Sequence, residues 1–560
     1  MDIKLIKNPY MLCAESSAAS YAAWNNRNYE MMFTRKLGFK FATDNFCENS
    51  VIGNRISLDN KPEEMAMCLY KYHGIAVDHF ASDNIELIFN EVLKQVKNNV
   101  PVSLYADKLD MYLAIDSKND NEIICIDIHS TPSNSEEKDY VKKILNLSEL
   151  KSVEAKNPYY GIYTYSISGN EKKDINTASF FEELKELDYF ANYKEKKLMM
   201  MEFAGCIKDN ADFQKETEGY DNPFFVPLIN GIIQIASSKK LFSYSLQYVY
   251  SLNGDGEIYD VSKKIANAAE VWELIRQLLI KAFYAKNFND KLKVKIIDYI
   301  KRAADFEEEI IESITNYAAI TDGVNFKGVA PVLKIEQNKD KNDNLKVYEI
   351  LAEEKTSFSE VNINKDKIVP VNIDKYFNNI AFGKSVSIQS KANFTGTGYY
   401  FISENAPTCG CFEPDNLKFK FPSTVEEAFD NISCDEQEIE VTPGLYNSIL
   451  LLGTAEYGDF VDSLTVEFEN GRREKINMAF SEWWRGKPIY NEKIAWRGKI
   501  VEKKEDTVKL LERDHFIYSI MRPIGEKAKM IKIFLPFCPN MHIFSISLGL
   551  QYIEQDKHDR

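Results

Sequence analysis

One cysteine near the start of the chain has the setting of a reactive thiol. Cys13 stands directly before a run of mostly small residues, 14–20, which predicts a helix that begins at the cysteine. The positive end of a helix dipole favours the thiolate, the form of cysteine that attacks thioesters, esters and amides. The alternative is that Cys13 is a small buried hydrophobe on a core helix. The residues that follow favour the first interpretation, so the sequence predicts Cys13 as a nucleophile.

The segments after Cys13 follow each other in a distinctive order. They are a helical run at 18–24, an aromatic-rich segment at 33–39, an expected strand at 100–105, and residues 112–115, which lead through a polar turn to 123–127. In this order the first 170 residues resemble the N-terminal domain of the butirosin biosynthesis protein H family. The resemblance implies a papain-like cysteine-peptidase fold and transfer of an acyl group from a carrier-protein thioester to an amine.

The resemblance also assigns catalytic positions. The family nucleophile falls on Cys13, and the acid that orients the base falls on Asp127 at the end of the second strand. The family histidine falls on Met111, and a thioether cannot take a proton from a thiol. Cysteine catalysis of this kind needs an imidazole within hydrogen-bond reach of the sulfur. A different residue must therefore serve as the base.

Six histidines are available for that role. They are His73, His79, His129, His515, His542 and His558. His129 lies two residues beyond Asp127 and faces the same side if the strand continues, so it is the candidate base. His73 and His79 flank the predicted end of a helix, where capping and surface histidines are common, and we expect both to be structural. The candidate catalytic residues are Cys13, Asp127 and His129.

Charge and cysteine content exclude several classes of protein. The formal net charge is −16 and the basic residues are scattered among more numerous acids, which argues against a nucleic-acid partner. Nine cysteines include no C-x-x-C pair, so neither a zinc site nor a disulfide framework is expected. No segment has the roughly 20 apolar residues that cross a bilayer, and residues 1–9 lack the apolar stretch of a signal peptide. We expect a cytoplasmic protein without metal, cofactor or membrane partner.

The pattern of elements changes twice along the chain. A chain of 560 residues is too long for one core, and we expect about three domains. Residues 1–170 mix helical and strand patterns, 177–320 read as a helical bundle, and 325–556 are rich in strand patterns. The predicted fold class is therefore multidomain α+β, with a papain-like α/β domain, a helical segment and a C-terminal antiparallel β-sandwich of the jelly-roll type.

A hairpin near residue 470 is the clearest local signal. Leu464, Val466 and Phe468 alternate with polar residues, Asn470-Gly471 supplies a turn, and the alternation resumes at 476–480. Further strands are expected at 417–421, 446–453 and 530–534. Together they indicate an antiparallel sandwich.

The region from about 365 to 555 resembles galactose-binding-like jelly-roll modules that are appended to bacterial glycoside hydrolases. The resemblance depends on a Phe-x-Gly-x-Gly turn at 394–398, a Leu-Leu-Gly strand at 451–453 and the Glu482-Trp483 pair after the hairpin. Three tryptophans of the region are candidates for a platform that stacks on a sugar ring or an acyl chain, because aromatic faces offer large apolar area at low entropic cost. They are Trp483, Trp484 and Trp496. One member of the adjacent pair is expected in the core, because neighbouring strand residues point to opposite faces.

Basic residues are unusually dense in the same region. They are Arg472, Arg473, Lys475, Arg485, Lys487, Lys493, Arg497 and Lys499. They would suit an acidic carrier protein, and they equally suit a sheet edge decorated with cations to prevent strand pairing.

Two functions remain. The favoured one is a cysteine-dependent acyl or aminoacyl transferase of specialised-metabolite biosynthesis, with an acyl carrier protein or other thioester as donor and an amine as acceptor. The alternative is a catalytically degenerate papain-like protein that binds carbohydrate or a protein partner as a scaffold. Plain amidase or peptidase activity follows from the same resemblance, but it depends even more on a well-placed histidine.

Overall fold

The structure of the chain is a computed structural model. It describes residues 1, 3–7, 10–36, 38–42, 51–58, 62–106, 110–131, 140–151, 160–187, 193–317, 367–424, 427–504 and 506–550. The chain divides into two compact units, called here the N-terminal and the C-terminal unit. The N-terminal unit comprises Met1–Asn210, Asn230–Trp272 and Ile300–Asn344, and the C-terminal unit comprises Ala211–Ile229, Glu273–Tyr299 and Leu345–Arg560. The expected boundary between the helical and the β-rich region, near residue 325, lies outside the described residues.

The N-terminal unit contains a six-stranded antiparallel sheet. Its order is β3 (Ile75–Ser82), β8 (Tyr160–Ile167), β4 (Val102–Ala106), β5 (Asp110–Asn119), β6 (Glu122–Asp127) and β7 (Lys142–Asn146). The polar turn expected between residues 116 and 122 is the hairpin that joins β5 to β6, so this prediction is confirmed.

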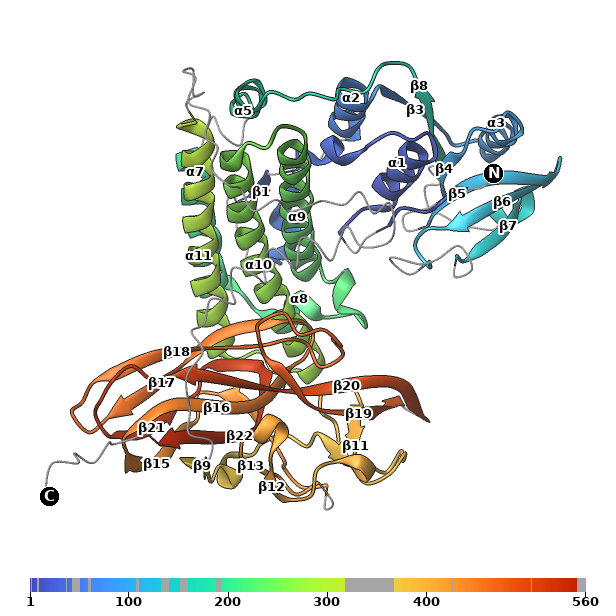
Figure 1. Ribbon diagram of the computed structural model, residues 1–560. Coiled ribbons are helices and arrows are strands. Elements are labelled where there is room, and N and C mark those ends of the chain that lie inside the picture. The colour runs from blue at the N-terminus through green and yellow to red at the C-terminus, as the bar shows by residue number, and fades with distance from the viewer. Residues whose placement is uncertain are drawn as a thin grey trace, which may run out of the picture. The chain divides into compact units, whose positions relative to one another are not determined.

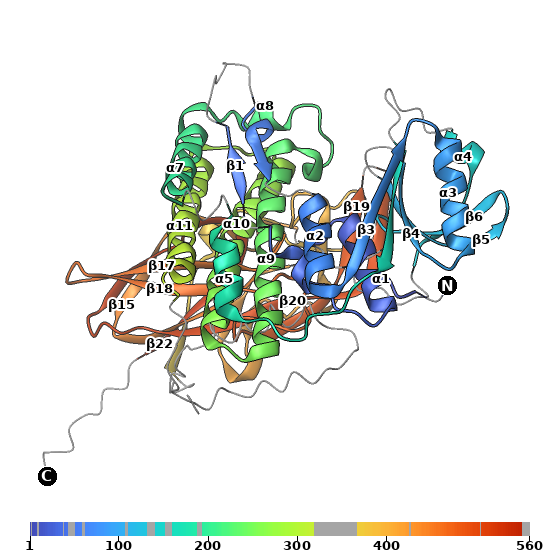
Figure 2. The same cartoon turned by 90° about the horizontal axis from the view of Figure 1, so that it is seen from above.

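Helices cover both faces of this sheet. Tyr112 and Ala114 of β5 pack against α3 (Ile85–Lys97), which Figure 2 shows along one face. Leu113 and Ile115 point the other way, into a cluster that includes Cys13 of α1 (Cys13–Trp24). The alternation follows from the two-residue period of a strand. It brings the start of α1 beside the centre of the sheet.

The remaining elements of the first 210 residues are short, apart from α2 and α7. They are β1 (Phe39–Phe41), β2 (Ile56–Leu58), α2 (Pro62–His73), α4 (Leu147–Lys151), α5 (Thr177–Lys185) and α7 (Tyr193–Asn210).

Long helices follow, as the sequence predicted for 177–320. They are α9 (Pro227–Asn253), α10 (Gly256–Ala285) and α11 (Asp290–Thr315), and the short helix α8 (Phe213–Thr217) precedes them. Within the N-terminal unit, α9, α10 and α11 share a core that contains Phe242, Ile265 and Ile310, and they run side by side in both views (Figures 1 and 2). These helices contribute residues to both units.

The C-terminal unit contains the expected β-sandwich, drawn from yellow to red in Figure 1. The larger sheet has the order β10 (Phe382–Gly383), β11 (Tyr399–Ile402), β19 (Lys493–Lys504), β20 (Thr507–Pro523), β16 (Tyr446–Ala455), β22 (Phe537–Leu550) and β14 (Ile432–Asp435), with β9 (Ile368–Val371) also paired to β22. The smaller sheet has the order β15 (Glu438–Gly444), β21 (Met530–Phe534), β17 (Phe460–Phe468) and β18 (Arg473–Phe480). A separate pair is β12 (Gly410–Phe412) with β13 (Phe419–Phe421).

The predicted hairpin is β17 and β18. Leu464 lies opposite Ile476, the side chains of Val466 and Met478 are fully buried, and Gly471 adopts a φ of +77° in the turn. A positive φ suits glycine, which explains the Asn-Gly signal. The strands expected at 417–421, 446–453 and 530–534 are β13, β16 and β21. Every helix in the described part of the chain is too short or too polar to cross a lipid bilayer.

Candidate functional site

Cys13 is the first residue of α1, so the predicted helix start at the cysteine is confirmed. The Leu12 N–H, which precedes the helix, donates to the Glu15 carboxylate at 2.8 Å. Glu15 is itself buried and paired with Lys36. The Ala18 and Ala19 side chains are fully buried, and their small size lets the helix approach the sheet closely. Cys13 is partly exposed at the positive end of the dipole.

Asp127 ends β6 and is buried, but its carboxylate is occupied by its own turn and the next strand. Oδ1 accepts from the Ser130 N–H at 2.9 Å, and Oδ2 accepts from the Ser130 hydroxyl at 2.8 Å and from Lys143 Nζ at 2.7 Å. Burial acts to raise the pKa of Asp127, but the Lys143 ammonium and the Ser130 donors outweigh it and hold that pKa below its ordinary value. Asp127 therefore fixes the shape of the turn 128–131 as an anion.

Lys7 binds the turn that follows Asp127. Its ammonium donates to three carbonyl oxygens of the turn, those of Ile128 at 2.6 Å, His129 at 3.2 Å and Thr131 at 2.5 Å. Burial lowers the pKa of Lys7, while Cys13, when it is ionised, and Asp127 act to raise it. A lysine cation thus acts electrostatically on both the candidate nucleophile and the candidate acid. Sequence reasoning missed Lys7.

His129 lies in the same turn with its side chain exposed. Within the described ranges its imidazole makes no polar contact, and only its backbone carbonyl takes part in the Lys7 network. The base role of His129 stays a prediction. Met111, the position of the family histidine, lies in β5 opposite Tyr105.

Two further histidines of the N-terminal unit have polar partners. His73 is buried, accepts from the Met31 N–H at 3.1 Å and faces Glu171, and His79 contacts the Tyr105 hydroxyl at 2.8 Å. His515 and His542 belong to the C-terminal unit, and His558 lies outside the described residues.

The Asp127–Lys143 pair gives a first prediction. Lys143→Met is expected to lower the free energy of unfolding by about 1 kcal/mol at pH 7, because a buried carboxylate loses a charged hydrogen bond that is partly screened by solvent. The pKa of Asp127 is depressed in the folded state, so this stability is present above the unfolded pKa and is lost as pH falls through the folded pKa. Urea unfolding at pH 7 and near pH 3 measures it.

The control for that prediction is Lys142→Met, which removes an exposed lysine on the opposite face of β7. It should change stability by less than about 0.5 kcal/mol at both pH values. Equal losses for the two variants would show that the Lys143 contact contributes nothing.

The candidate tryptophans of the C-terminal unit divide between a cavity and the core. A cavity of about 330 Å³ is lined by Thr395, Thr397, Tyr399, Tyr457, Glu482, Trp483, Trp484, Ile500, Leu511, Arg513 and His515. Trp484 is 36% exposed and Trp483 only 5%. Trp483 packs on Phe394 and on His515, with ring centroids 4.9 Å and 4.6 Å away. Trp496 packs on Phe382 at 5.4 Å and does not line the cavity.

Ionisable groups of this cavity are held in unusual states. Burial raises the pKa of Glu482 to about 7, with the charge of Asp459 adding to the effect. Burial lowers the pKa of His515 to about 4, so its ring is neutral at pH 7. Arg513 lies over the Trp484 ring at 4.5 Å and donates to the Trp484 carbonyl at 3.2 Å. Sequence reasoning treated Glu482 as a scaffold residue and missed the other two.

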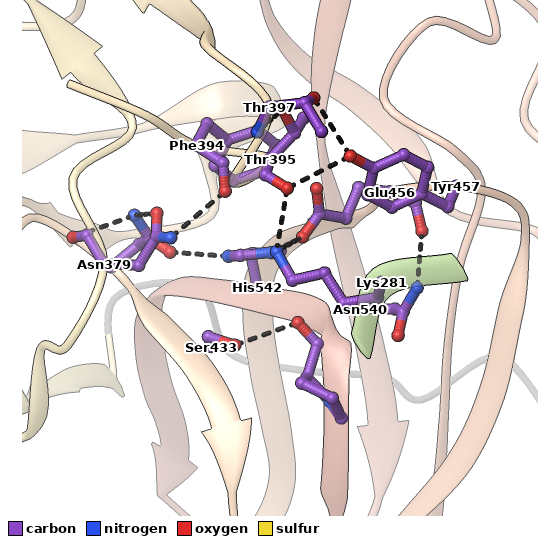
Figure 3. A network of polar contacts seen from close by, with 12 residues as sticks. Lys281, Asn379, Phe394, Thr395, Thr397, Ser433, Glu456, Tyr457, Asn540 and His542 are labelled. Carbon is purple, nitrogen blue, oxygen red and sulfur yellow. Dashed lines mark hydrogen bonds and ion pairs between the residues drawn. The ribbon is translucent and has the colours of Figure 1, made fainter. Parts of the chain in front are cut away.

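A buried polar network lies behind one wall of this cavity (Figure 3). Lys281 of α10 is paired with Glu456 and donates to the Thr395 carbonyl at 3.2 Å. The Tyr457 hydroxyl donates to the same carbonyl at 3.2 Å and contacts the Thr397 hydroxyl at 3.0 Å. Lys281 therefore holds the wall formed by Thr395, Thr397 and Tyr457 from within the unit.

The protons of this network can be placed from its hydrogen bonds. Asn431 Nδ2 donates to Asn379 and Asp430, so Asn431 Oδ1 must face His542 Nδ1 as an acceptor, at 2.8 Å. His542 Nδ1 is therefore protonated. Its Nε2 lies 2.9 Å from Glu456 Oε1, a distance that requires one proton shared between imidazole and carboxylate.

The dense basic residues are largely paired with acids. Arg472 pairs with Glu526, Arg473 with Glu467, Arg485 with Asp459 and Lys499 with Asp514. Arg473 begins β18, which is an edge strand of the smaller sheet. This placement suits the protection of a sheet edge. Among the described residues, no three His, Cys, Asp or Glu side chains gather closely enough to hold a metal ion.

Comparison with known proteins informs the C-terminal unit. No curated protein matches the chain. Residues 366–551 match the model of a family described as the AziU2-like beta-sandwich domain. The match covers the strands from β9 to β22 and agrees with the sandwich expected from the sequence between about 365 and 555. This part of the chain is similar to AziU2-like β-sandwich domains.

Proposed function

We propose that the N-terminal unit is a papain-like, cysteine-dependent acyl or aminoacyl transferase of specialised-metabolite biosynthesis. The observation that carries the proposal is the Lys7 ammonium, which is bound to the turn after Asp127 and acts on Cys13 at the start of α1. A cation and a helix N-terminus both favour a thiolate at a partly exposed cysteine. The resemblance to the butirosin-type family supplies the reaction.

The reaction has two steps. The Cys13 thiolate attacks the carbonyl carbon of a carrier-protein thioester, a new C–S bond forms, and the carrier thiolate leaves. An amine then attacks the acyl-Cys13 carbonyl, the C–S bond breaks, and the amide product forms. The carrier thiolate takes the proton that the amine loses, and Cys13 returns as a thiolate. Asp127 positions the turn that holds Lys7, and His129 is the candidate for proton transfer at the amine.

Mass spectrometry of the intact protein tests the proposal. After incubation with an acetyl thioester of N-acetylcysteamine, the full chain should gain one acetyl group on Cys13. Cys13→Ser should gain none on the same time scale, and Cys411→Ser should behave like the unmodified chain. Cys411 is an exposed comparison whose pKa is raised by its hydrogen bond to Glu413. Acetylation of Cys411 with Cys13 unmodified would defeat the proposal.

A second candidate function is recognition of carbohydrate or of a protein partner by a catalytically degenerate chain. The observation in its favour is the cavity beside Trp483 and Trp484. Absence of any adduct on Cys13 with several thioesters, together with saturable binding of methyl β-galactoside, would favour this function over transfer.

A further inference from the structure

We infer that the cavity of the C-terminal unit binds a small molecule with a primary ammonium group on an apolar body. The inference uses no residue of the N-terminal unit, so it stands apart from the transfer proposal. It depends on the shape of the cavity, on the hydrogen-bonding state of its polar groups and on the charge that remains at Glu482.

Size and walls restrict the ligand first. At about 330 Å³ the cavity lies at the small end of ligand sites, which suits a molecule of the size of an amino acid or a monosaccharide. Its walls are mainly the rings of Tyr399, Tyr457, Trp483 and Trp484 with two aliphatic residues. Such walls favour an apolar body. Aromatic faces also attract a cation, although the Trp484 ring already carries the Arg513 guanidinium at 4.5 Å.

The carboxylate of Glu482 restricts the ligand next. Arg485 is the cation closest to it in sequence, but its Nε and Nη2 donate to Asp459 at 2.9 Å and 2.7 Å. Burial and the charge of Asp459 make ionisation of Glu482 costly, and the hydrogen bond from the Trp484 side chain and the charges of Arg485 and Arg276 offset that cost only in part. A ligand cation would relieve this cost, because it would pair with a carboxylate that is poorly solvated.

His515 adds a second acceptor. Its Nδ1 lies 3.1 Å from the Arg513 carbonyl, which can only accept, so Nδ1 carries the proton of the neutral ring. Nε2 then has a lone pair for a donor. Two acceptors beside aromatic rings match an ammonium group, which has three donors and no acceptor.

The hydroxyl groups of the cavity favour an ammonium ligand over a sugar. Thr395 contacts Thr397 at 2.8 Å, and Thr397 contacts Tyr457 at 3.0 Å, so these groups satisfy one another (Figure 3). A sugar presents several hydroxyls that each need donors and acceptors when buried. An ammonium ligand needs only the carboxylate and the imidazole.

Calorimetric titration of the full chain tests the inference. The probes are 2-phenylethylamine, phenylalanine, 3-phenylpropanol and methyl β-galactoside. The amine should bind saturably and the neutral alcohol at least tenfold more weakly, because it lacks the charge. Comparison of phenylalanine with 2-phenylethylamine shows whether Arg513 also binds the carboxylate of a ligand. Tighter binding of the galactoside than of the amine, or no binding of the amine, would overturn the inference.

Two variants locate the site. Glu482→Gln should weaken amine binding at least tenfold and leave binding of the alcohol unchanged, whereas Glu440→Gln, at an exposed carboxylate of β15, should change neither. Trp484→Ala removes an exposed ring without opening the core and should also lower the affinity for the amine. Cys13→Ser should bind the amine with unchanged affinity. A failure of amine binding can therefore be distinguished from a failure of acyl transfer. Amine binding that Glu482→Gln and Trp484→Ala both leave intact would contradict the assignment.

The pH dependence provides an independent measurement. Glu482 must be ionised to pair with an ammonium group, so amine affinity should fall as pH drops below about 7. The charged and titratable groups around it are Asp459, Arg485, Arg276, Arg513, Tyr399, Tyr457, Tyr518 and His515. Burial raises the pKa of Tyr399 and of Tyr457, so both stay neutral near pH 7. His515 titrates near pH 4 and Tyr518 has a strongly raised pKa, so neither changes state near pH 7. Affinity that stays constant between pH 5.5 and 8 would contradict the role of Glu482.

Discussion

Lys7→Met is expected to slow acylation of Cys13 about a hundredfold, in line with the loss of one fixed electrostatic group at a reacting centre. The Lys7 ammonium is held by the carbonyl oxygens of Ile128 and Thr131 at 2.6 Å and 2.5 Å, so it is fixed before any substrate arrives. Removing it leaves a half-buried thiol without its cation and lowers the thiolate fraction. The measurement is the rate of acetyl transfer to Cys13, followed by intact mass.

Lys4→Met is the matched control, because Lys4 is an exposed lysine of the same segment. It should acylate at the original rate. Lys7→Arg keeps the charge and should retain most of the rate. His129→Ala distinguishes the two possible roles in the turn: a loss of about 10² to 10⁴ would assign the general base to His129, and no change would leave Lys7 as the group that activates Cys13. A Lys7→Met protein that reacts like Lys4→Met would remove the basis for the proposed mechanism.

Lys281→Met is expected to lower the free energy of unfolding by about 3 to 5 kcal/mol, the cost typical of leaving one member of a buried ion pair without its partner. Glu456 is fully buried and shares a proton with His542 at 2.9 Å, so loss of the ammonium leaves a desolvated carboxylate without its cation. The variant also releases the Thr395 carbonyl, which should weaken ligand binding in the cavity. Urea unfolding monitored by tryptophan fluorescence measures the loss, since Trp483, Trp484 and Trp496 all lie in this unit.

Two further variants make that prediction specific. Lys281→Met combined with Glu456→Gln should recover most of the stability, because the second change removes the uncompensated charge and still offers His542 a hydrogen bond. Lys291→Met removes the exposed partner of Asp435 and should cost less than about 1 kcal/mol. A single-variant loss no larger than that of Lys291→Met would show that the buried pair adds no stability.

Local patterns accounted for the elements that carry the sites. The run of small residues after Cys13 predicted the start of α1, and the alternation around Asn470-Gly471 predicted the β17–β18 hairpin with its buried Leu464 face. Both depend on neighbours within a few residues, where the helix and strand periods determine which side chains share a face. The family resemblance placed Asp127 at the end of a strand, where β6 does end.

The partners of those residues were decided by the tertiary structure. Lys7 reaches a carbonyl 121 residues away, and Lys281 pairs with a glutamate 175 residues away. Glu482 and His515 line the same cavity although they are far apart in the sequence. Glu482 precedes β19, and His515 lies in β20, the second strand of the β19–β20 hairpin. A short window of sequence does not predict such contacts, because they depend on the order of the strands in the sheet and on which helix covers which face of the sheet.

The sequence by itself thus determined a nucleophile candidate at a helix N-terminus, a helical block and a C-terminal β-sandwich. Only the tertiary structure decided that Lys7 binds the turn after Asp127, that the partly buried Trp496 packs against the core while Trp484 borders a cavity, and that Lys281, Glu456 and His542 form one network. The physical reason is burial. The state of an ionisable or aromatic side chain depends on what surrounds it after folding, and residue type and spacing do not contain that information.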